Sequence, residues 1–514
     1  MRRALGYRTK YRQRTIVETL PAPIGGLNNR DALASMPNSD AYFLENWFPT
    51  TDGVVTRNGN TTHVSGIGGT IETLAVYSGG SANQLISFNN GKMFNVTAAG
   101  APGPELTTGR TSNKNVTAMF SNAATHFLIG VNGADTPFSY NGTAYAALTI
   151  TGITGTQNNL AYVFPFKGRL YLAAINELVF YYLAVGAIQG AATSFDLSQI
   201  ASKGGYLMAI GSITLDTGSG PDDFIAFVTS EGEVLVYKGT DPSAAATFAL
   251  VGRYSIGRPI GRKCISKYGG DALVITDMGL TPLSMLFKSE EPTLRDSLSS
   301  KLGNALISHN QFSATHGWHV MLHPANTMLI LNVPHGTGGE FHQYVMNTIT
   351  GAWCVFNGWK GYSFAEMNGN LYYGAAGGKV YRADTGSSDD GVAIVCNART
   401  AYNYFEKYEL KHWHNARLHM ETIGNPELSV GFNIDYIEEE PSFVVSQVDA
   451  GDGELWDVAT WDVAEWAGAT EVRSQWADIN DLGFTASTVV RVKSSASTVK
   501  WFATEYLFEY GGVI

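Results

Sequence analysis

The sequence is poor in cysteine and in charged side chains. Its 514 residues contain three cysteines, Cys264, Cys354 and Cys396, which lie far apart and form no CxxC pair. This spacing argues against a zinc knuckle and a disulfide framework, and it suits a reducing site of assembly. Only 15% of the residues are charged, whereas 57 are glycine. That balance favours many short strands joined by tight turns over long exposed helices.

A long hydrophobic run is also missing. Met1-Arg2-Arg3 resembles the start of a secretion signal, but no apolar segment follows it. The longest apolar stretch, Leu178 to Ile188, is too short to span a bilayer. We therefore expect a soluble, unexported chain without a membrane anchor.

Basic residues are outnumbered, and the two signs of charge are separated along the chain. The net charge of −11 argues against a nucleic-acid binder that uses its whole surface. Residues 1–20 nevertheless form a basic arm, with Arg2, Arg3, Arg8, Lys10, Arg12 and Arg14. The stretch from Asp435 to Asp481 is acidic and includes Asp449, Asp452, Glu454 and Asp457. We expect the arm to become ordered on a partner protein, with nucleic acid and plain disorder as the alternatives.

What the sequence does have is a recurring hairpin, in which two apolar strands flank a turn containing glycine or asparagine. Seven candidates begin at Leu85, Phe127, Leu170, Phe224, Ala272, Gln343 and Leu371. Their turns fall near residues 91, 133, 176, 232, 279, 351 and 377. Most of these intervals match the roughly 40–50 residues of one propeller blade. The prediction is an all-β fold with a β-propeller of six or seven blades at residues 71–400.

Two intervals differ most from this spacing: the long one between the turns near 279 and 351, and the short one between those near 351 and 377. Each has a local explanation. Helical periodicity over residues 291–310, with Leu298, Leu302 and Leu306 on one face, predicts a short amphipathic insertion. After it, HVMLHP, TMLILNV, FHQYVMN and AWCVF read as the four strands of one complete blade. The short last interval predicts an incomplete blade that other strands finish.

The flanking regions differ in character from the repeats. Residues 21–70 form an extended lead-in, and residues 401–514 contain longer alternating strands that predict a β-sandwich-like domain. Within that domain, Trp456, Trp461 and Trp466 recur every five residues, which suits neither a helix face nor a strand. We interpret them as buried anchors of an irregular loop, with a glycan-stacking platform as the alternative.

No arrangement typical of catalysis is found. GxSxG, HExxH and phosphate-loop motifs are missing, so neither a catalytic site nor a cofactor is predicted. No metal site is predicted either: His412 and His414 share a strand face, but His419 has the opposite parity, which favours packing or interface roles.

Three clusters of acidic or basic residues remain, and we predict a non-catalytic role for each. The DAGDGE loop misses the register of a calcium-binding loop, so a solvated turn is favoured over calcium. Asp222 and Asp223 are interpreted as turn residues. A basic cluster of Arg253, Arg258, Arg262 and Lys263 could contact DNA or an acidic neighbour, while a solvated loop or subunit contact is favoured.

Residues 21–59 carry a Gly-Gly-Leu-Asn start, GGLN, followed by the step NWFP. This segment resembles the opening of proteins found in tailed bacteriophages. From about Leu160 to Asp384, the order FKGRLYLAA, ALVITDMG, LRDSLSSKLGNAL and TMLILNVP is similar to that of the packaged-DNA stabilisation proteins of short-tailed phages, also called tail hub or nozzle proteins. The closing WFATEYLFEYGGVI is similar as well.

The resemblance implies a non-catalytic subunit of the virion tail, assembled in the cytoplasm of the host bacterium. Such a subunit would form a homo-hexamer below the portal and adaptor, retain packaged DNA and contact it transiently during ejection, next to spike, fibre or needle proteins. Because clustered cations would trap phosphates, we expect the basic arm to face the adaptor and part of the acidic excess to face the channel. The alternatives are a glycan- or receptor-binding tail tip and a neck or connector protein of a longer-tailed phage.

Overall fold

The chain divides into two compact units. The computed structural model describes residues 15–80, 82–216, 221–244, 247–288, 297–336, 338–405, 407–445 and 470–511. Residues Asn58–Val392 form one unit, here called the propeller unit, and Met1–Arg57 with Ala393–Ile514 form the other, the terminal unit. This division differs from the predicted boundaries, because the lead-in segment is shared between the two units. None of the helices in these ranges is long and apolar enough to cross a membrane.

Five separate antiparallel sheets follow one another in the propeller unit, and each is a meander of neighbouring strands. The first two are β7 (Ile71–Gly79), β8 (Ala82–Asn89), β9 (Lys92–Asn95), β10 (Glu105–Thr107), and β11 (Val116–Ser121), β12 (His126–Val131), β13 (Phe138–Tyr140), β14 (Tyr145–Ala147). The third is β16 (Leu160–Phe166), β17 (Arg169–Ala174), β18 (Val179–Tyr182), β20 (Thr193–Asp196). The fourth is β21 (Leu207–Asp216), β22 (Pro221–Thr229), β23 (Glu233–Gly239), β24 (Phe248–Ser255), and the fifth is β25 (Ile265–Tyr268), β26 (Asp271–Thr276), β27 (Gly279–Pro282).

Two further four-stranded ladders continue the series. One consists of β28 (His319–His323), β29 (Met328–Pro334), β30 (Phe341–Asn347) and β31 (Trp353–Asn357). The other consists of β32 (Ser363–Met367), β33 (Asn370–Gly374) and β34 (Val380–Ala383), and it is completed by β6 (Asn60–Val64) from the start of the unit. The incomplete last blade is therefore finished by a distant strand, as predicted.

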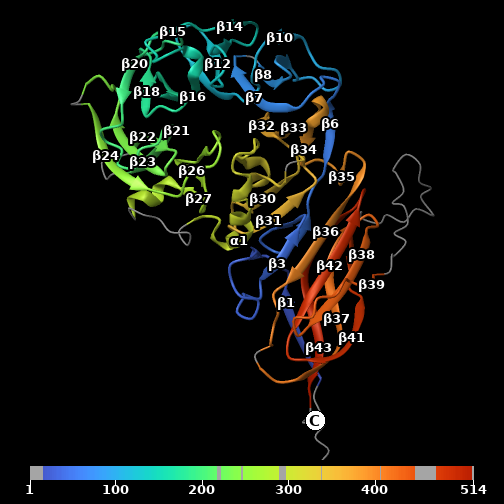
Figure 1. Ribbon diagram of the computed structural model, residues 1–514. Helices are drawn as coiled ribbons and strands as arrows, with labels where there is room; N and C mark the ends of the chain where they lie inside the picture. Colours follow the sequence, from blue (N-terminus) through green and yellow to red (C-terminus); the bar gives the residue numbers. More distant parts are fainter. Residues whose placement is uncertain are drawn as a thin grey trace, which may run out of the picture. The chain divides into compact units, whose positions relative to one another are not determined.

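The first strands of successive sheets contact one another around a ring, which closes where β32 meets β7. Figure 1 shows this ring of blades in the propeller unit. The predicted β-propeller is confirmed, and counted with the two ladders the described blades number seven, the larger of the two predicted values. Each of the seven predicted hairpins forms two neighbouring strands of one blade: the middle pair in five blades, and the last pair in β26–β27 and β30–β31.

Turn chemistry and apolar faces explain why these residues form blades. Asn90 and Gly91 join β8 to β9 with φ of 51° and 72°, the left-handed pair that a two-residue hairpin turn needs. A Cβ atom on Gly91 would lie 2.6 Å from the carbonyl oxygen of Arg110. Between the first two blades, the buried cluster consists of Ala75, Tyr77, Ile86, Phe88, Met93, Leu128, Phe138 and Tyr140. Burial between neighbouring blades is what stabilises each sheet.

The helical insertion is shorter than predicted in the described residues. It consists of η4 (Ser300–Leu302), α1 (Gly303–Ile307) and η5 (Ser308–Phe312), while the predicted part at 291–296 lies outside the described residues. Leu302 and Leu306 are buried, as the predicted apolar face requires. The remaining short elements are η1 (Gln157–Asn159), η2 (Leu283–Phe287), η6 (Pro324–Asn326), η7 (Ala376–Gly378), the parallel pair β15 (Ile150–Thr151) and β19 (Gly190–Ala191), and β35 (Ser388–Asp389), which pairs with β6.

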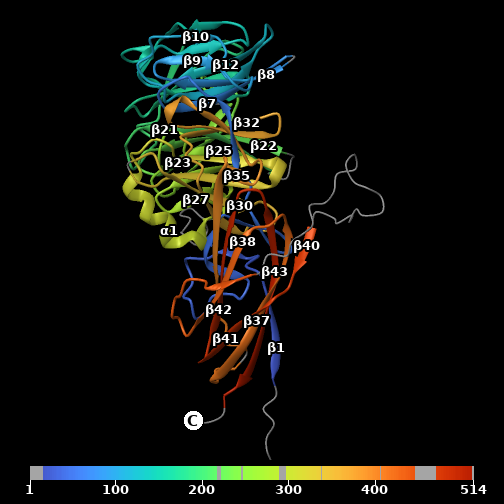
Figure 2. The same ribbon diagram turned by 90° about the vertical axis from the view of Figure 1, so that its right-hand side faces the viewer.

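The terminal unit combines the two ends of the chain in two sheets. One contains β1 (Ile16–Pro21), β4 (Trp47–Pro49), β5 (Val54–Thr56), β37 (Lys411–Ile423), β40 (Thr470–Arg473), β41 (Trp476–Gly483) and β43 (Thr498–Tyr510). The other contains β2 (Gly26–Leu27), β3 (Asp40–Glu45), β36 (Val392–Thr400), β38 (Glu427–Ile434), β39 (Phe443–Val444) and β42 (Ala486–Ser494). Figure 2 shows the long strands β37, β42 and β43 of this unit.

Both sheets of the terminal unit contribute to one core, which gives the predicted sandwich-like arrangement. Its buried members are Phe405, Trp413, Ala416, Ile434, Ala486, Tyr506 and Phe508. A second centre joins the two chain ends directly: Trp47 and Trp501 are both fully buried, with ring centroids 6.3 Å apart in edge-to-face geometry. The lead-in segment is therefore structural in this unit.

Candidate functional site

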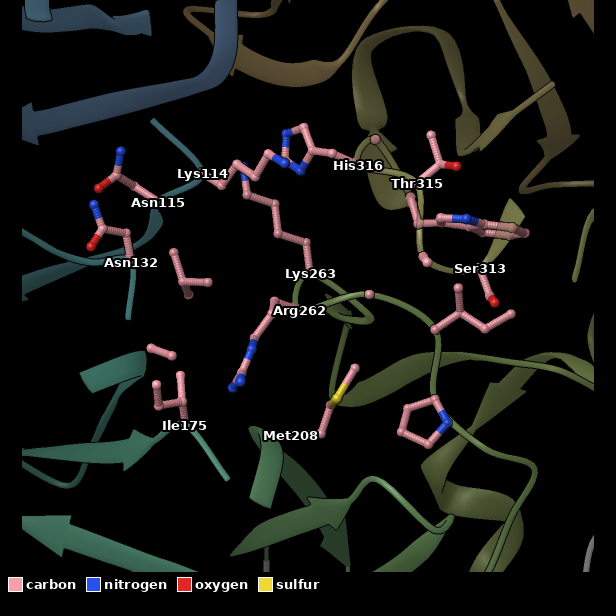
Figure 3. Close-up of a pocket in the computed structure, with 18 of the residues that line it drawn as sticks. Lys114, Asn115, Asn132, Ile175, Met208, Arg262, Lys263, Ser313, Thr315 and His316 are labelled. Atoms are coloured by element: carbon pink, nitrogen blue, oxygen red, sulfur yellow. The ribbon is translucent and has the colours of Figure 1, made fainter. Parts of the chain in front are cut away.

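Charged and polar side chains from several blades gather around a pocket at the axis of the propeller unit. Most of its lining residues precede or begin the first strands of five successive blades, β11, β16, β21, β25 and β28, while Asn132 and Ile175 follow the second strands β12 and β17. Loops of five blades thus converge on one place. The cavity measures about 500 Å³. Figure 3 shows Lys114, Arg262, Lys263 and His316 among the side chains around it. We call it the axial pocket.

The axial pocket is basic. Lys114, Arg262 and Lys263 line it, and no Asp or Glu is among the lining residues. Lys114 has its nearest acid in Glu72, with Nζ 3.8 Å from Oε1. The polar remainder of the lining consists of Ser112, Asn115, Asn132, Tyr206, Ser313, Thr315 and His316, together with the indole of Trp318. A cavity of this kind attracts anions.

Arg262 and Lys263 make few hydrogen bonds in the pocket. The Nη1 atom of Arg262 is buried and has no hydrogen-bond partner, and the guanidinium lies 5.7 Å from the ring centroid of Tyr206. Lys263 Nζ donates to Ser363 Oγ at 3.2 Å. Burial lowers the pKa of Lys263 to about 8, because the charged ammonium loses hydration there. An anion in the pocket would supply the missing counter-charge.

The neighbouring histidines are neutral at neutral pH. His316 Nε2 donates to the backbone carbonyl of Glu72 at 2.7 Å, and burial lowers the pKa of His316 to about 4. Burial, followed by repulsion from Lys263, lowers the pKa of His319 to about 3. His319 and Lys263 also line a second cavity of about 350 Å³ between the inner strands, so Lys263 faces both spaces.

The predicted basic cluster is therefore split. Arg262 and Lys263 lie in the axial pocket, whereas Arg253 donates to the carbonyl oxygen of Ile200 and Arg258 pairs with Glu231 at 2.9 Å on the surface. Lys114 and His316 were missed, because they come from other blades. The signal that could have found them is their place just before a blade's first strand, where loops converge on a propeller axis.

Several predicted residues fall outside the described part of the chain. These are Arg2, Arg3, Arg8, Lys10, Arg12 and Arg14 of the arm, the acidic residues Asp449, Asp452, Glu454 and Asp457, and Trp456, Trp461 and Trp466. The three cysteines are among the described residues, and the side chains of all three are buried.

The acidic residues and histidines that were predicted to be non-catalytic form ion pairs, hydrogen bonds and ring contacts with neighbouring side chains. Asp222 and Asp223 lie on strand β22 and not in a turn; Asp222 pairs with Lys238 at 2.6 Å, and Asp223 accepts from Thr214 at 2.8 Å. His412 and His414 are adjacent, with ring centroids 4.3 Å apart, while His419 contacts Glu505 at 3.0 Å.

Within the described residues one group could hold a metal ion, and the sequence prediction did not include it. It consists of His309, His335 and His342. His309 lies on η5, His342 on β30, and His335 directly follows β29. Burial, followed by repulsion from His335 and His309, lowers the pKa of His342 to about 4.

Fold and pocket together define a β-propeller protein with a basic axial pocket. A comparison with protein-family models gives no match, and neither does a comparison with curated proteins. Among solved structures, the computationally designed Ika8 protein is similar over 63% of this chain and 99% of its own, with 13% identity and a TM-score of 0.36. BBS1N in complex with ARL6DN is similar over 64% and 97%, with 11% identity and a TM-score of 0.36.

YCF48 from Cyanidioschyzon merolae is similar over 58% of this chain and 79% of its own, with 13% identity and a TM-score of 0.27. With TM-scores this low, the similarities carry no conclusion about fold or function. The propeller assignment rests on strand pairing alone.

Proposed function

We propose that this chain is a structural tail hub or nozzle subunit of a bacteriophage, which attaches below the portal and adaptor and retains packaged DNA. The observation that carries the proposal is the packing of the segments that resemble phage proteins. The NWFP step and the closing strand belong to one sheet, in which Lys500 and Trp501 pair with Val55 and Val54. Two regions more than 440 residues apart in the sequence thus form one structural element.

The proposed assembly is a homo-hexamer around the DNA exit channel, with no enzymatic role and no cofactor. The basic arm would bind the adaptor, because the six cations of residues 1–14, with no acid among them, suit an acidic protein surface. DNA would touch the assembly only transiently during ejection.

The test is to delete the coding sequence in a phage or prophage that encodes it. Particles without the chain should contain portal and adaptor but lose their DNA, and the chain should be found by mass spectrometry in tails of intact particles. Particles that retain DNA but do not adsorb to cells would favour a receptor-binding tail tip. Electron micrographs with the chain above a long tube would favour a neck protein.

The arm can be tested separately by reversing the charges of Arg2, Arg3, Arg8 and Arg12. Docking to purified portal–adaptor complexes, measured by co-sedimentation, should be abolished. Reversal of Arg253 and Arg258, which lie outside the axial pocket, serves as the control and should leave docking intact. Unimpaired docking of the arm variant would contradict the proposed role of the arm.

We further propose that the axial pocket binds an anionic group of the phosphate type. The specific observation is a cavity lined by three cationic side chains and no carboxylate, in which Arg262 Nη1 has no partner. Inorganic phosphate should raise the melting temperature of the chain more than chloride does at equal ionic strength, because it binds only the folded state. Arg262→Gln should remove this difference, whereas Arg258→Gln on the surface should keep it. Equal stabilisation of all three proteins would contradict the proposal.

A further inference from the structure

Three imidazole side chains meet in the propeller unit, and nothing in the tail proposal uses them. One potential ligand atom from each of His309, His335 and His342 lies within 4.8 Å of the other two. The rings of His335 and His342 are stacked with centroids 4.1 Å apart, and that of His309 lies 5.4 Å and 5.7 Å from them. This is the spacing of side chains that converge on a common point.

The β29–β30 hairpin brings two of these side chains together. Val333 is the strand partner of His342, and the backbone N–H of His335 donates to the carbonyl of Glu340 at 2.8 Å. His335 thus lies opposite residue 340, two positions from His342, so both side chains are on the same face of the hairpin. In the sequence, this arrangement is visible only as two histidines separated by six residues, H-x₆-H, across a turn.

The third side chain comes from the helical insertion. His309 lies on η5, which packs against β29, and only 5% of its surface is exposed. Its Nε2 atom lies 3.1 Å from the hydroxyl of Tyr344, whereas its Nδ1 atom is buried and makes no hydrogen bond of good geometry, although the backbone of Pro334 interacts with the ring and acts to raise its pKa. Buried polar atoms without partners are rare in folded proteins. A metal ion would satisfy this nitrogen.

In one of its two neutral tautomers, His309 leaves Nδ1 available to a metal ion. When Nε2–H donates to Tyr344, the lone pair of the neutral ring is on Nδ1. Metal-ligating histidines usually have such a second hydrogen bond, which orients the ring. His335 is exposed, so the group also has an open side for water or another ligand.

We propose that His309, His335 and His342 bind a divalent transition-metal ion, with Zn²⁺ as the first choice. Three imidazole ligands without a thiolate suit Zn²⁺, Co²⁺, Ni²⁺ or Cu²⁺ and not Mg²⁺ or Ca²⁺, which prefer oxygen ligands. Zinc–nitrogen bonds of about 2.0–2.1 Å place tetrahedral ligand atoms about 3.4 Å apart, so the three nitrogens would have to approach by up to about 1.4 Å. Rotation of the exposed His335 ring can supply much of this movement. The ion would link the helical insertion to the sixth blade.

The experiment is calorimetric titration of the full chain, free of any histidine tag, with Zn²⁺. One ion should bind per chain, and His335→Gln should weaken binding at least tenfold while leaving the circular dichroism spectrum of the metal-free protein unchanged. Tyr344→Phe should weaken binding about tenfold, because it removes the hydrogen bond that orients His309. His126→Gln, at a single exposed histidine of the same unit, is the matched control and should bind like the wild type.

Two further measurements identify the site. Co²⁺ should give the visible absorption of a four- or five-coordinate ion with nitrogen ligands in the wild type and lose it in His335→Gln. The double variant His412→Gln/His414→Gln removes the adjacent histidine pair of β37 and should keep binding. The proposal is overturned if no ion binds at this stoichiometry, if His335→Gln binds as tightly as the wild type, or if the His412/His414 variant loses binding.

Discussion

Trp47 is one of the fully buried side chains on which the packing of the terminal unit depends. Its ring is fully buried against Trp501. Trp47→Ala should lower the free energy of unfolding by about 3–5 kcal/mol, because it leaves a large cavity. Trp47→Phe should cost clearly less, since it keeps an aromatic ring and the indole Nε1 has no hydrogen-bond partner to lose.

Urea unfolding followed by circular dichroism measures this difference. The matched control is Trp476→Ala, because Trp476 is 38% exposed and contacts the guanidinium of Arg417 at 4.7 Å. That control should stay within about 1 kcal/mol of the wild type. Equal losses for Trp47→Ala and Trp476→Ala would contradict the proposed packing role.

Lys263 makes the axial pocket a source of pH-dependent stability. Its pKa is lowered by burial to about 8 in the folded chain, whereas the unfolded chain keeps the ordinary value of about 10.4. Between these values the unfolded state binds more protons, so stability rises with pH through this window. Lys263→Met should therefore stabilise the protein at pH 7, by about 2 kcal/mol after allowance for partial exposure.

The advantage of Lys263→Met should shrink as the pH rises from 8 toward 10.5. Urea unfolding at pH 7 and pH 10 measures it, and Lys267→Met, at an exposed lysine of the neighbouring strand, should show no such change. A constant difference at both pH values would show that Lys263 is not desolvated in the folded chain.

At the scale of single residues, local sequence patterns predicted which residues form turns and basic stretches. They did not predict which residues from different blades meet in one pocket. The seven turns could be predicted because glycine and asparagine act within two residues of themselves. The basic stretch around Arg262 and Lys263 was visible for the same reason. Lys114, His316 and the His309 group were missed, because their meeting depends on which loops a closed ring brings together.

At the scale of elements, β6 is the strand on which closure of the ring depends. It comes from the start of the propeller unit and pairs with β34 at its end, so that Thr62 lies opposite Tyr381. The sequence predicted an incomplete last blade but could not say which strand completes it, since strand pairing over such a distance leaves no periodic trace.

A disulfide at this closure tests the pairing. In Thr62→Cys/Tyr381→Cys, oxidation should raise the melting temperature, because the bond closes a loop of about 300 residues and restricts the unfolded chain. The reduced form of the same protein is the control. Thr62→Cys/Tyr373→Cys, which joins residues of non-adjacent strands, should not form the bond. A failure of the first pair to cross-link under mild oxidation would contradict the closure.

At the scale of the whole molecule, the two units predict independent folding of the propeller. Residues 58–392 are contiguous and contain all seven blades, including β6. This fragment should be soluble, rich in β-structure and cooperative in thermal unfolding. The fragment 65–392, which lacks β6, should melt at a clearly lower temperature or aggregate through its open edge. Equal stability of the two fragments would mean that β6 does not close the ring.

The terminal unit depends on both ends of the chain, which sequence alone could not show. Residues 21–70 looked like a separate lead-in because their strands are short and lack a strong period. Their partners, β43 among them, lie hundreds of residues away, so only the folded chain reveals the pairing. The long strands after residue 401 were predicted correctly, because alternation along a strand is a local property.

The pairing of β6 with β35 also bears on how such a chain could change over generations. The two strands run side by side, with Asn60 opposite Asp389, so these two positions near the start and the end of the propeller unit lie within one strand spacing, about 4.8 Å. A segment with adjacent ends can be exchanged, enlarged or lost by recombination at two junctions, here near residues 57 and 393. Because the entropy of closing an insertion grows only slowly with its length, a propeller with more or fewer blades would fit the same junctions.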